Sequence, residues 1–92
     1  MSSFKLRLFI AGKTDRSERA VANVRRICEK DLRDVYELEI IDVIEQPDIA
    51  DQEKIMATPT LIKQLPPPLR RIVGDLSDTD KVLRGLNLIR MD

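Results

Sequence analysis

The fold follows from residues 4–43, which read FKLRLFIAGKTDRSERAVANVRRICEKDLRDVYELEIIDV. Apolar and charged residues alternate from Phe4 to Leu8, and the segment ends with apolar residues on both faces at Phe9 and Ile10, which predicts a β-strand. A helix follows, because apolar residues then recur at helical spacing; Thr14 or Asp15 caps it, the latter with Glu18 at capping-box spacing. The apolar stripe of this helix consists of Ala20, Val21, Val24, Ile27, Cys28 and Leu32. A second apolar strand over residues 35–43 completes a strand–helix–strand unit.

The second half of the chain gives shorter signals. Pro47 predicts the start of a short helix that reaches about Lys54, because proline in a first helical turn loses no hydrogen bond. Residues 56–62 predict a turn that enters a strand, with Pro59 in a cis bond or at a sheet edge. Three prolines at 66–68 form a stiff connector to a short strand over residues 70–73.

The last segment is ambiguous. Ser77 and Asp80 have capping-box spacing, and a helical stripe follows that consists of Val82, Leu83, Leu86 and Ile89. Gly85, however, falls in the middle of that helix at a cost of about 1 kcal/mol, and residues 86–88 alternate like a strand. The sequence from Leu61 onward therefore does not commit to one structure.

The composition excludes several classes of protein. A chain of 92 residues forms one domain, residues 1–92, of the α/β class. Lys and Arg number 16, as do Asp and Glu, and 3% of residues are aromatic, which argues against nucleic-acid binding. Histidine is absent and Cys28 is the single cysteine, so we expect no catalytic residue, metal site or cofactor. No apolar run has the length of a membrane span or signal peptide, and we expect a cytoplasmic protein without membrane contact.

The order of the expected elements is that of a thioredoxin-like fold. Redox members of that fold begin the first helix with CxxC, because a helix N-terminus lowers the pKa of a thiol. Here residues 12–17 read GKTDRS and contain no thiol. Cys28 lies on the apolar stripe instead, which favours a buried core residue over a redox sensor. We therefore expect a thioredoxin-like scaffold without its redox chemistry.

Several segments of the chain resemble the KaiB family of circadian clock proteins. They are Phe9-Ile10-Ala11-Gly12, Val35-Tyr36, Ile41-Asp42-Val43, Ala57-Thr58-Pro59-Thr60-Leu61, the run from Leu69 to Asp78, and Lys81-Val82-Leu83 with Gly85-Leu86. The similarity extends from about Phe4 to Ile89. It implies a non-enzymatic regulator that binds a KaiC-type hexameric ATPase and modulates its phosphorylation or ATPase cycle, in a clock whose third component is KaiA.

The resemblance also implies two folds. Family members adopt a thioredoxin-like monomer or a related ground-state α+β fold that assembles into tetramers, and the C-terminal half changes its secondary structure between them. We therefore expect self-association as a dimer or tetramer and a switch between two packings of similar free energy. Gly85 lowers helix propensity where the thioredoxin-like state needs a helix, so Gly85→Ala is expected to favour that state. The alternative is that Gly85 packs closely against a neighbour.

Three residues depart from the clock members of the family. Glu37 and Glu39 stand where those members have Ala and Lys, on the strand that includes the KaiA-binding edge, and Asn87 replaces an Asp. Because like charges across an interface are costly, we expect that this chain does not bind KaiA in the cyanobacterial way. The alternative is that Glu37 and Glu39 only make an exposed strand face soluble. The chain is similar to a KaiB paralogue, or to a homologue in a timing or stress-response system without KaiA.

The candidate interaction residues are mostly basic. Arg70 and Arg71 have the guanidinium geometry of a phosphate or carboxylate clamp, the alternative being a solvated strand end. The resemblance implies that they and Lys54 contact a partner or another copy of the chain, and that Gly85 and Asn87 belong to the switch. Pro59 is expected to shape the backbone, and residues 74–78 to form a turn and helix cap and not a calcium loop.

Three functions therefore compete. The first is the KaiB-like regulator, with a sensor histidine kinase among its expected partners. The second is a thioredoxin-like redox protein that uses Cys28, for example through glutathionylation. The third is the input module of a sensor kinase, which is also thioredoxin-like and competes for the same ring; the end of the chain at Asp92 favours the first over the third.

Overall fold

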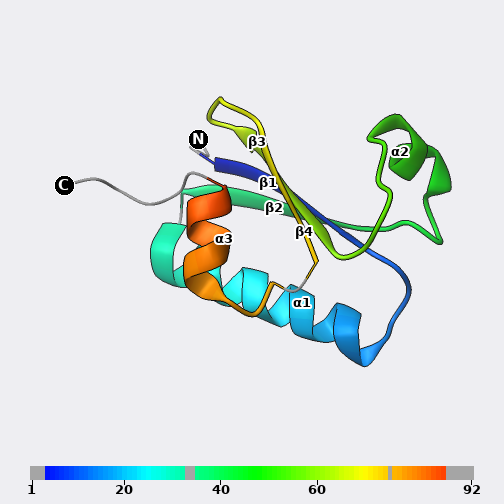
Figure 1. The fold of residues 1–92 in the computed structure, drawn as a ribbon, viewed down its shortest axis with the longest axis horizontal. Coiled ribbons are helices and arrows are strands. Elements are labelled where there is room, and N and C mark those ends of the chain that lie inside the picture. The colour runs from blue at the N-terminus through cyan, green and yellow to red at the C-terminus, as the bar shows by residue number, and fades with distance from the viewer. Residues whose placement is uncertain (1–3, 33–34, 75, 87–92) are drawn as a thin grey trace.

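The computed structural model describes residues 4–32, 35–74 and 76–86, which form a mixed α/β fold with the thioredoxin-like arrangement (Figure 1). Strands and helices follow one another as expected along the chain. Their order is β1 Phe4–Ile10, α1 Asp15–Ile27, a π-helical turn Cys28–Leu32, β2 Tyr36–Asp42, α2 Pro47–Gln52, β3 Thr60–Leu65, β4 Arg70–Val73 and α3 Thr79–Gly85. The first strand–helix–strand unit is thus confirmed, with α1 prolonged by one wider turn.

The four strands form one sheet in the order β2-β1-β3-β4. β1 and β2 run parallel from the pair Phe4–Tyr36 to the pair Ile10–Asp42, whereas β3 is antiparallel to both β1 and β4. β3 therefore lies inside the sheet, and the expectation that Pro59 marks a sheet edge is wrong. The other expectation is confirmed, since the Thr58–Pro59 bond is cis and the proline precedes the first residue of β3.

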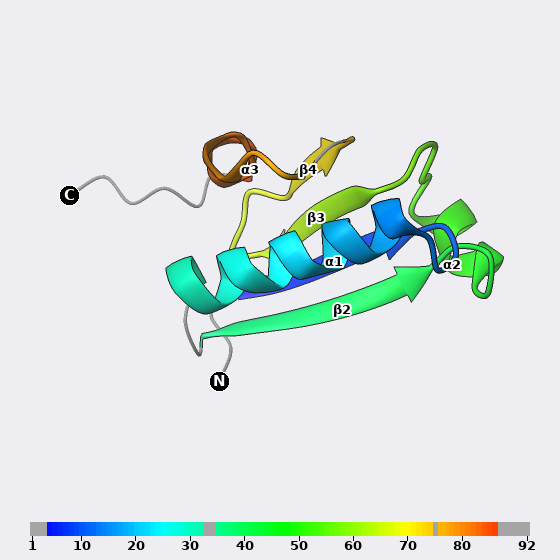
Figure 2. The same ribbon diagram turned by 90° about the horizontal axis from the view of Figure 1, so that it is seen from below.

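The two faces of the sheet are covered differently. α1 and α3 pack on one face, where the large apolar cluster joins Leu6, Leu8 and Leu61 of the strands to Val24 of α1 and Val82 of α3 (Figures 1 and 2). The opposite face carries a smaller cluster that consists of Phe9, Ile41 and Ile62, with Val43, Ile49 and Ile55 against it. α2 supplies Ile49 and lies at the far end of the sheet from α3 (Figure 1). Among the described residues, α2 is therefore the helix that contacts this second face, and it contacts only the end that carries the smaller cluster.

The helix caps settle two alternatives left by the sequence. Thr14 caps α1, because its Oγ1 accepts a hydrogen bond from the Ser17 backbone N–H at 3.1 Å. The capping-box spacing of Asp15 and Glu18 is therefore not used. At α3 the cap is Asp78, whose Oδ1 accepts from the Lys81 N–H at 3.2 Å, so the Ser77–Asp80 spacing was also a wrong prediction. In both helices the residue directly before the helix is the cap, whereas the capping-box spacing points to the residue next to it.

The last described segment is a short helix. Gly85 is the final residue of α3 and not a mid-helix residue, and Leu86 behind it is fully buried. A Cβ on Gly85 would lie 2.7 Å from Cγ1 of Ile72 and closer still to its Cδ1, which is tighter than side-chain atoms tolerate. Gly85 therefore packs closely against Ile72, as the alternative proposed, and this contact argues against the expectation that Gly85→Ala favours this fold. The strand-like alternation over residues 86–88 falls mostly outside the described residues.

Candidate functional site

The turn between β1 and α1 occupies the place where redox members of the fold carry their cysteines. The backbone N–H groups of Gly12 and Ile44 donate to Oδ1 of Asp42 at 3.0 and 2.9 Å. These two hydrogen bonds, first that of Gly12, lower the pKa of Asp42, so the carboxylate stays ionised and ties the turn to the end of β2. Gly12 has φ +73°, which favours glycine. This turn is braced by a carboxylate and carries no thiol.

Cys28 lies in the core at the end of α1. Its side chain is fully buried in the cluster that α1 shares with the sheet. Burial raises the pKa of Cys28 from 9.0 to about 11, although the nearby charge of Arg25 acts in the opposite direction. Since the thiolate is the reactive form, the thiol is both inaccessible and almost wholly protonated at neutral pH. The prediction of a core residue is confirmed, and the geometry gives no support to a redox role.

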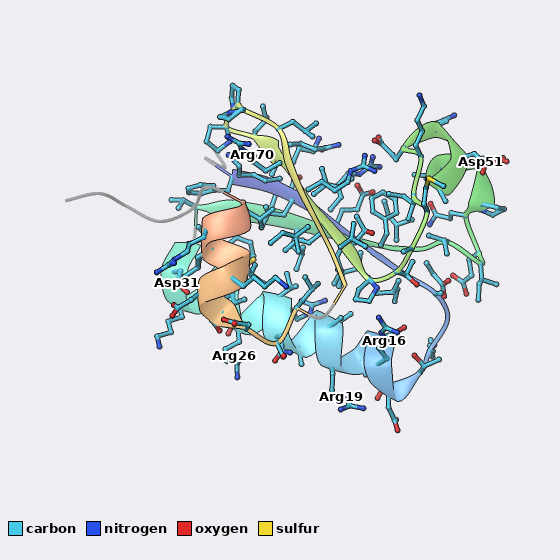
Figure 3. All side chains as sticks on the ribbon, in the orientation of Figure 1. Arg16, Arg19, Arg26, Asp31, Asp51 and Arg70 are labelled. Atoms are coloured by element: carbon cyan, nitrogen blue, oxygen red, sulfur yellow. The ribbon has the colours of Figure 1, made fainter. Side chains whose placement is uncertain are left out.

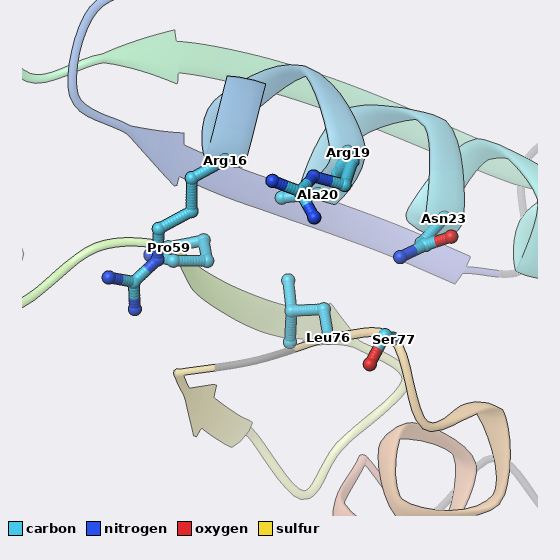
Figure 4. A pocket seen from close by; sticks show the side chains of 7 residues that line it. All are labelled: Arg16, Arg19, Ala20, Asn23, Pro59, Leu76 and Ser77. Carbon is cyan, nitrogen blue, oxygen red and sulfur yellow. The ribbon is translucent and has the colours of Figure 1, made fainter. Parts of the chain in front are cut away.

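Pro59 lies beside α1 at the edge of a cavity of about 390 Å³ (Figure 4). The lining residues are Arg16, Arg19, Ala20 and Asn23 of α1, Pro59 before β3, and Leu76 and Ser77 before α3. The carbonyl of Pro59 accepts a hydrogen bond from the Gly74 N–H at 3.0 Å, which ties the start of β3 to the end of β4. Three segments that are distant in the sequence therefore meet at one concave surface.

Lys54 and Arg71 are brought together on the opposite face of the sheet. The guanidinium of Arg71 donates to the carbonyl oxygens of Glu53 at 2.9 Å and Lys54 at 3.2 Å. Lys54 itself has φ +55°, an unusual conformation for a residue with a side chain. Arg71 thus holds the bend that follows α2 and leaves the Lys54 side chain exposed. The planar fork of Arg71 is used inside the fold, so Arg71 is a positioning residue at this site.

Glu39 is part of an ion-pair network and not only a solubilising residue. Arg7 Nε contacts Glu39 Oε1 at 2.9 Å, and Arg7 Nη1 contacts Glu53 Oε1 at 3.0 Å. The Arg7 side chain is 17% exposed and the Glu39 side chain is 52% exposed, so Glu39 reaches toward solvent. Glu37 is exposed and lies opposite Lys5 in the strand register. The charge at position 39 therefore has an intramolecular partner on β1.

The remaining candidate residues lie elsewhere. Arg70 begins β4 at the side of the molecule away from Arg16 and Arg19 (Figure 3). It is paired in register with Lys63, which is buried and donates to the Pro66 carbonyl at 2.8 Å. Burial, and then the charge of Arg70, lower the pKa of Lys63. Gly85 packs on Ile72, and Asn87 lies outside the described residues. The structure thus distributes the described candidates over several places and not one cluster.

Sequence reasoning missed the arginines that matter most to these surfaces. Arg16 and Arg19 lie outside the apolar stripe of the first helix, and nothing in their spacing shows that Pro59 and Leu76 lie opposite them. The ion pair between Arg7 and Glu39 could have been predicted from the sequence, because opposite charges occupy matching positions in two parallel strands. The ion pair between Arg7 and Glu53 could not, since the end of α2 approaches β1 only in the folded chain.

Within residues 4–32, 35–74 and 76–86 no three Cys, Asp or Glu side chains gather as a metal site requires. The same ranges hold no helix with the length and apolar character needed to cross a bilayer.

The comparison with known families decides the relationship. The KaiB domain family matches residues 7–88 of the chain. The chain belongs to the KaiB family. Circadian clock protein KaiB3 of Synechocystis sp. is 61% identical over 89 residues, which cover 97% of this chain and 87% of that protein. Circadian clock oscillator protein KaiB of Prochlorococcus marinus strain MIT 9312 is 53% identical over 95% of this chain and 83% of its own length.

Solved structures place the fold of this KaiB-family chain among thioredoxin-like proteins. The N-terminal domain of Synechococcus elongatus SasA superposes with a TM-score of 0.76 at 24% identity, over 100% of this chain and 90% of that one. Mitochondrial thioredoxin 3 of Saccharomyces cerevisiae gives a TM-score of 0.74 at 18% identity, over 97% of this chain and 81% of that one. These similarities establish the fold alone, and they confirm the thioredoxin-like alternative for the structure described. The chain is thus a clock-protein relative whose fold is that of redox proteins.

Proposed function

We propose that this chain is a non-enzymatic regulator that binds a KaiC-type hexameric ATPase and modulates its phosphorylation or ATPase cycle. The observation that carries the proposal is the match of the KaiB domain over residues 7–88, together with relatives that are named as clock proteins. The system served is a circadian clock or a related timing or stress-response pathway. The protein acts in the cytoplasm, without nucleic acid, membrane, metal or cofactor.

The place where redox members of the fold carry their cysteines has no reactive thiol in this chain, which supports a binding role over a catalytic one. The turn over residues 12–17 has no thiol, and Cys28 is buried with a raised pKa. Electrostatics favour the same interpretation, because the positive side chains at the concave surface beside Pro59 suit recognition better than proton transfer. The fold therefore acts as a scaffold that presents surfaces to other proteins.

Two further partner assignments belong to the proposal. Binding of KaiA in the cyanobacterial way is not expected, because β2 carries Glu37 and Glu39 and the latter is already paired with Arg7. A sensor histidine kinase is proposed as a competitor or partner, since the SasA N-terminal domain has the same fold. Self-association as a dimer or tetramer, with a switch to the ground-state fold, remains proposed from the family.

A pull-down with the KaiC-type ATPase encoded by the same genome tests the proposal. The chain should co-purify with the ring in a nucleotide-dependent way and change its rate of ATP hydrolysis or its phosphorylation level. The matched control is Cys28→Ala, which removes the redox alternative and should bind the ring as the wild type does. A chain that leaves the ring's ATPase rate and phosphorylation unchanged and does not co-purify with it refutes the proposal. Reduction of insulin disulfides by the wild type, and not by Cys28→Ala, would favour the redox alternative.

A further inference from the structure

The cavity beside Pro59 has a chemically uniform wall. Arg16 extends past Pro59, while Arg19 and Asn23 lie along α1 facing Leu76 and Ser77 (Figure 4). Asn23 Oδ1 accepts from the Arg26 guanidinium at 3.2 Å, so its amide nitrogen is the group turned toward the cavity (Figure 4). The α1 side of the cavity therefore offers hydrogen-bond donors and positive charge.

The two arginines of this wall form no ion pair with any of the described residues. Among the described residues, the ion pairs are those of Arg7, and neither Arg16 nor Arg19 contacts a carboxylate. Arg19 makes one long hydrogen bond, from Nε to the Asp15 carbonyl at 3.5 Å. Arg19 also borders a second, more open depression around the helix, which it shares with Asp15 and Glu18, but no ion pair joins it to either carboxylate. Two guanidinium groups thus border the cavity without an ion pair among the described residues, whereas Arg7 is paired with two carboxylates and Arg71 donates to two backbone carbonyls.

The floor of the cavity is apolar. Ala20, Pro59 and Leu76 are buried, and they lie between the arginines and the segment before α3. The volume of about 390 Å³ is near the lower end of the range of ordinary binding pockets. Such a space suits a few side chains of a docked segment and not a large cofactor.

We propose that this cavity docks an acidic segment of the protein partner, with a Glu or Asp carboxylate between Arg16 and Arg19 and a neighbouring apolar side chain on Pro59 and Leu76. A carboxylate accepts hydrogen bonds without donating any, and therefore matches a wall made of donors. A free anion should be the poorer ligand, because it makes no contact with the apolar floor of Pro59 and Leu76. This inference rests on the proposed function, because the segment belongs to the ATPase ring.

The first experiment measures the affinity for the nucleotide-loaded ring. The double variant Arg16→Gln/Arg19→Gln should bind about tenfold more weakly or worse, with a shallower dependence on salt, because two charge-assisted contacts are lost. The matched control, Arg25→Gln/Lys30→Gln, removes the same charge from the same helical segment outside the cavity and should bind within about twofold of wild type. A double variant that binds like this control overturns the inference and leaves the proposed function intact.

The second experiment does not depend on the ring. The ¹⁵N-labelled chain is titrated with a capped hexapeptide of alternating glutamate and leucine, with a glutamine–leucine peptide as control. The glutamate peptide should shift the amide signals of Asn23, Leu76 and Ser77, and the Arg16→Gln/Arg19→Gln variant should lose these shifts while keeping a folded spectrum. Equal shifts with both peptides, shifts at other residues, or no shifts overturn the inference. So does inorganic phosphate that moves the same signals as strongly, because the site would then bind small anions. If the wild type shifts as expected but ignores the ring, the proposed function fails and the cavity chemistry stands.

Discussion

Gly85→Ala should destabilise the thioredoxin-like fold, although it replaces a glycine in a helix. A methyl group at this position would lie 2.7 Å from Cγ1 of Ile72, so the Ile72 side chain on β4 must move. Overpacking of this kind costs about 1–3 kcal/mol. The gain in helix propensity is at most about 1 kcal/mol, and smaller at the last residue of α3. We expect a net loss of about 1–2 kcal/mol in the free energy of unfolding.

A double-mutant cycle measures this effect by urea denaturation of the wild type, Gly85→Ala, Ile72→Ala and the double variant. Ile72→Ala removes both side-chain atoms that the new methyl group would meet. In that background Gly85→Ala should be neutral or stabilising by up to about 1 kcal/mol, which gives a coupling energy of about 1–3 kcal/mol between the two positions. Arg84→Ala, on the exposed side of α3, is the control and should change stability by less than about 0.5 kcal/mol. If Gly85→Ala stabilises the wild type, or if its effect is the same in both backgrounds, the close-packing explanation is wrong.

Three further predictions concern other parts of the fold. Arg71→Gln should lower the free energy of unfolding by about 1 kcal/mol and speed amide exchange in the bend after α2, because two hydrogen bonds to backbone carbonyls are lost. The control, Arg70→Gln, should leave that exchange unchanged. Burial raises the pKa of Cys28 from 9.0 to about 11, so its contribution to stability is complete below about pH 9 and falls by about 2 kcal/mol as the pH approaches 11. The free energies of unfolding of wild type and Cys28→Ala, measured by urea denaturation at a series of pH values, should therefore converge between about pH 9 and 11. A difference between the two proteins that stays constant with pH would contradict the raised pKa. Glu39→Gln should lower the free energy of unfolding by about 0.5 kcal/mol or less at low salt and leave it unchanged at high salt, because the ion pair of Glu39 with Arg7 is half-exposed. Glu37→Gln, the control, should leave the free energy of unfolding unchanged at both salt concentrations.

The first half of the fold is predictable because its signals are local. Alternation in β1 and the helical stripe in α1 are set by the same apolar residues that form the core, so the pattern and the packing agree. The short strand β4 also follows from the residues themselves, whereas the cis bond before Pro59 is one of two alternatives that the sequence leaves open. The sequence leaves the cap of α1 open between Thr14 and Asp15 and misplaces the cap of α3 by one residue, because short polar residues stand side by side and only the backbone geometry selects among them.

The rest depends on contacts between distant segments. Gly85 has two explanations in sequence, low helix propensity or close packing, and only the position of Ile72 on β4 distinguishes them. The bend at Lys54 is held by Arg71, seventeen residues later in the chain. The cavity beside Pro59 requires α1, β3 and the segment before α3 to meet, which no local pattern specifies. The surfaces proposed for recognition are therefore harder to predict from sequence than the scaffold that carries them.

Sedimentation velocity of the fluorescent chain with the nucleotide-loaded KaiC-type ring tests the central claim most directly. The label is placed on the N-terminal amine, because Cys28 is buried. The account predicts that the label moves to the sedimentation coefficient of the ring, in a saturable way, and that unlabelled wild-type chain displaces it. A label that stays at the position of the free chain with every nucleotide state of the ring would contradict the claim that this fold acts by binding such an ATPase.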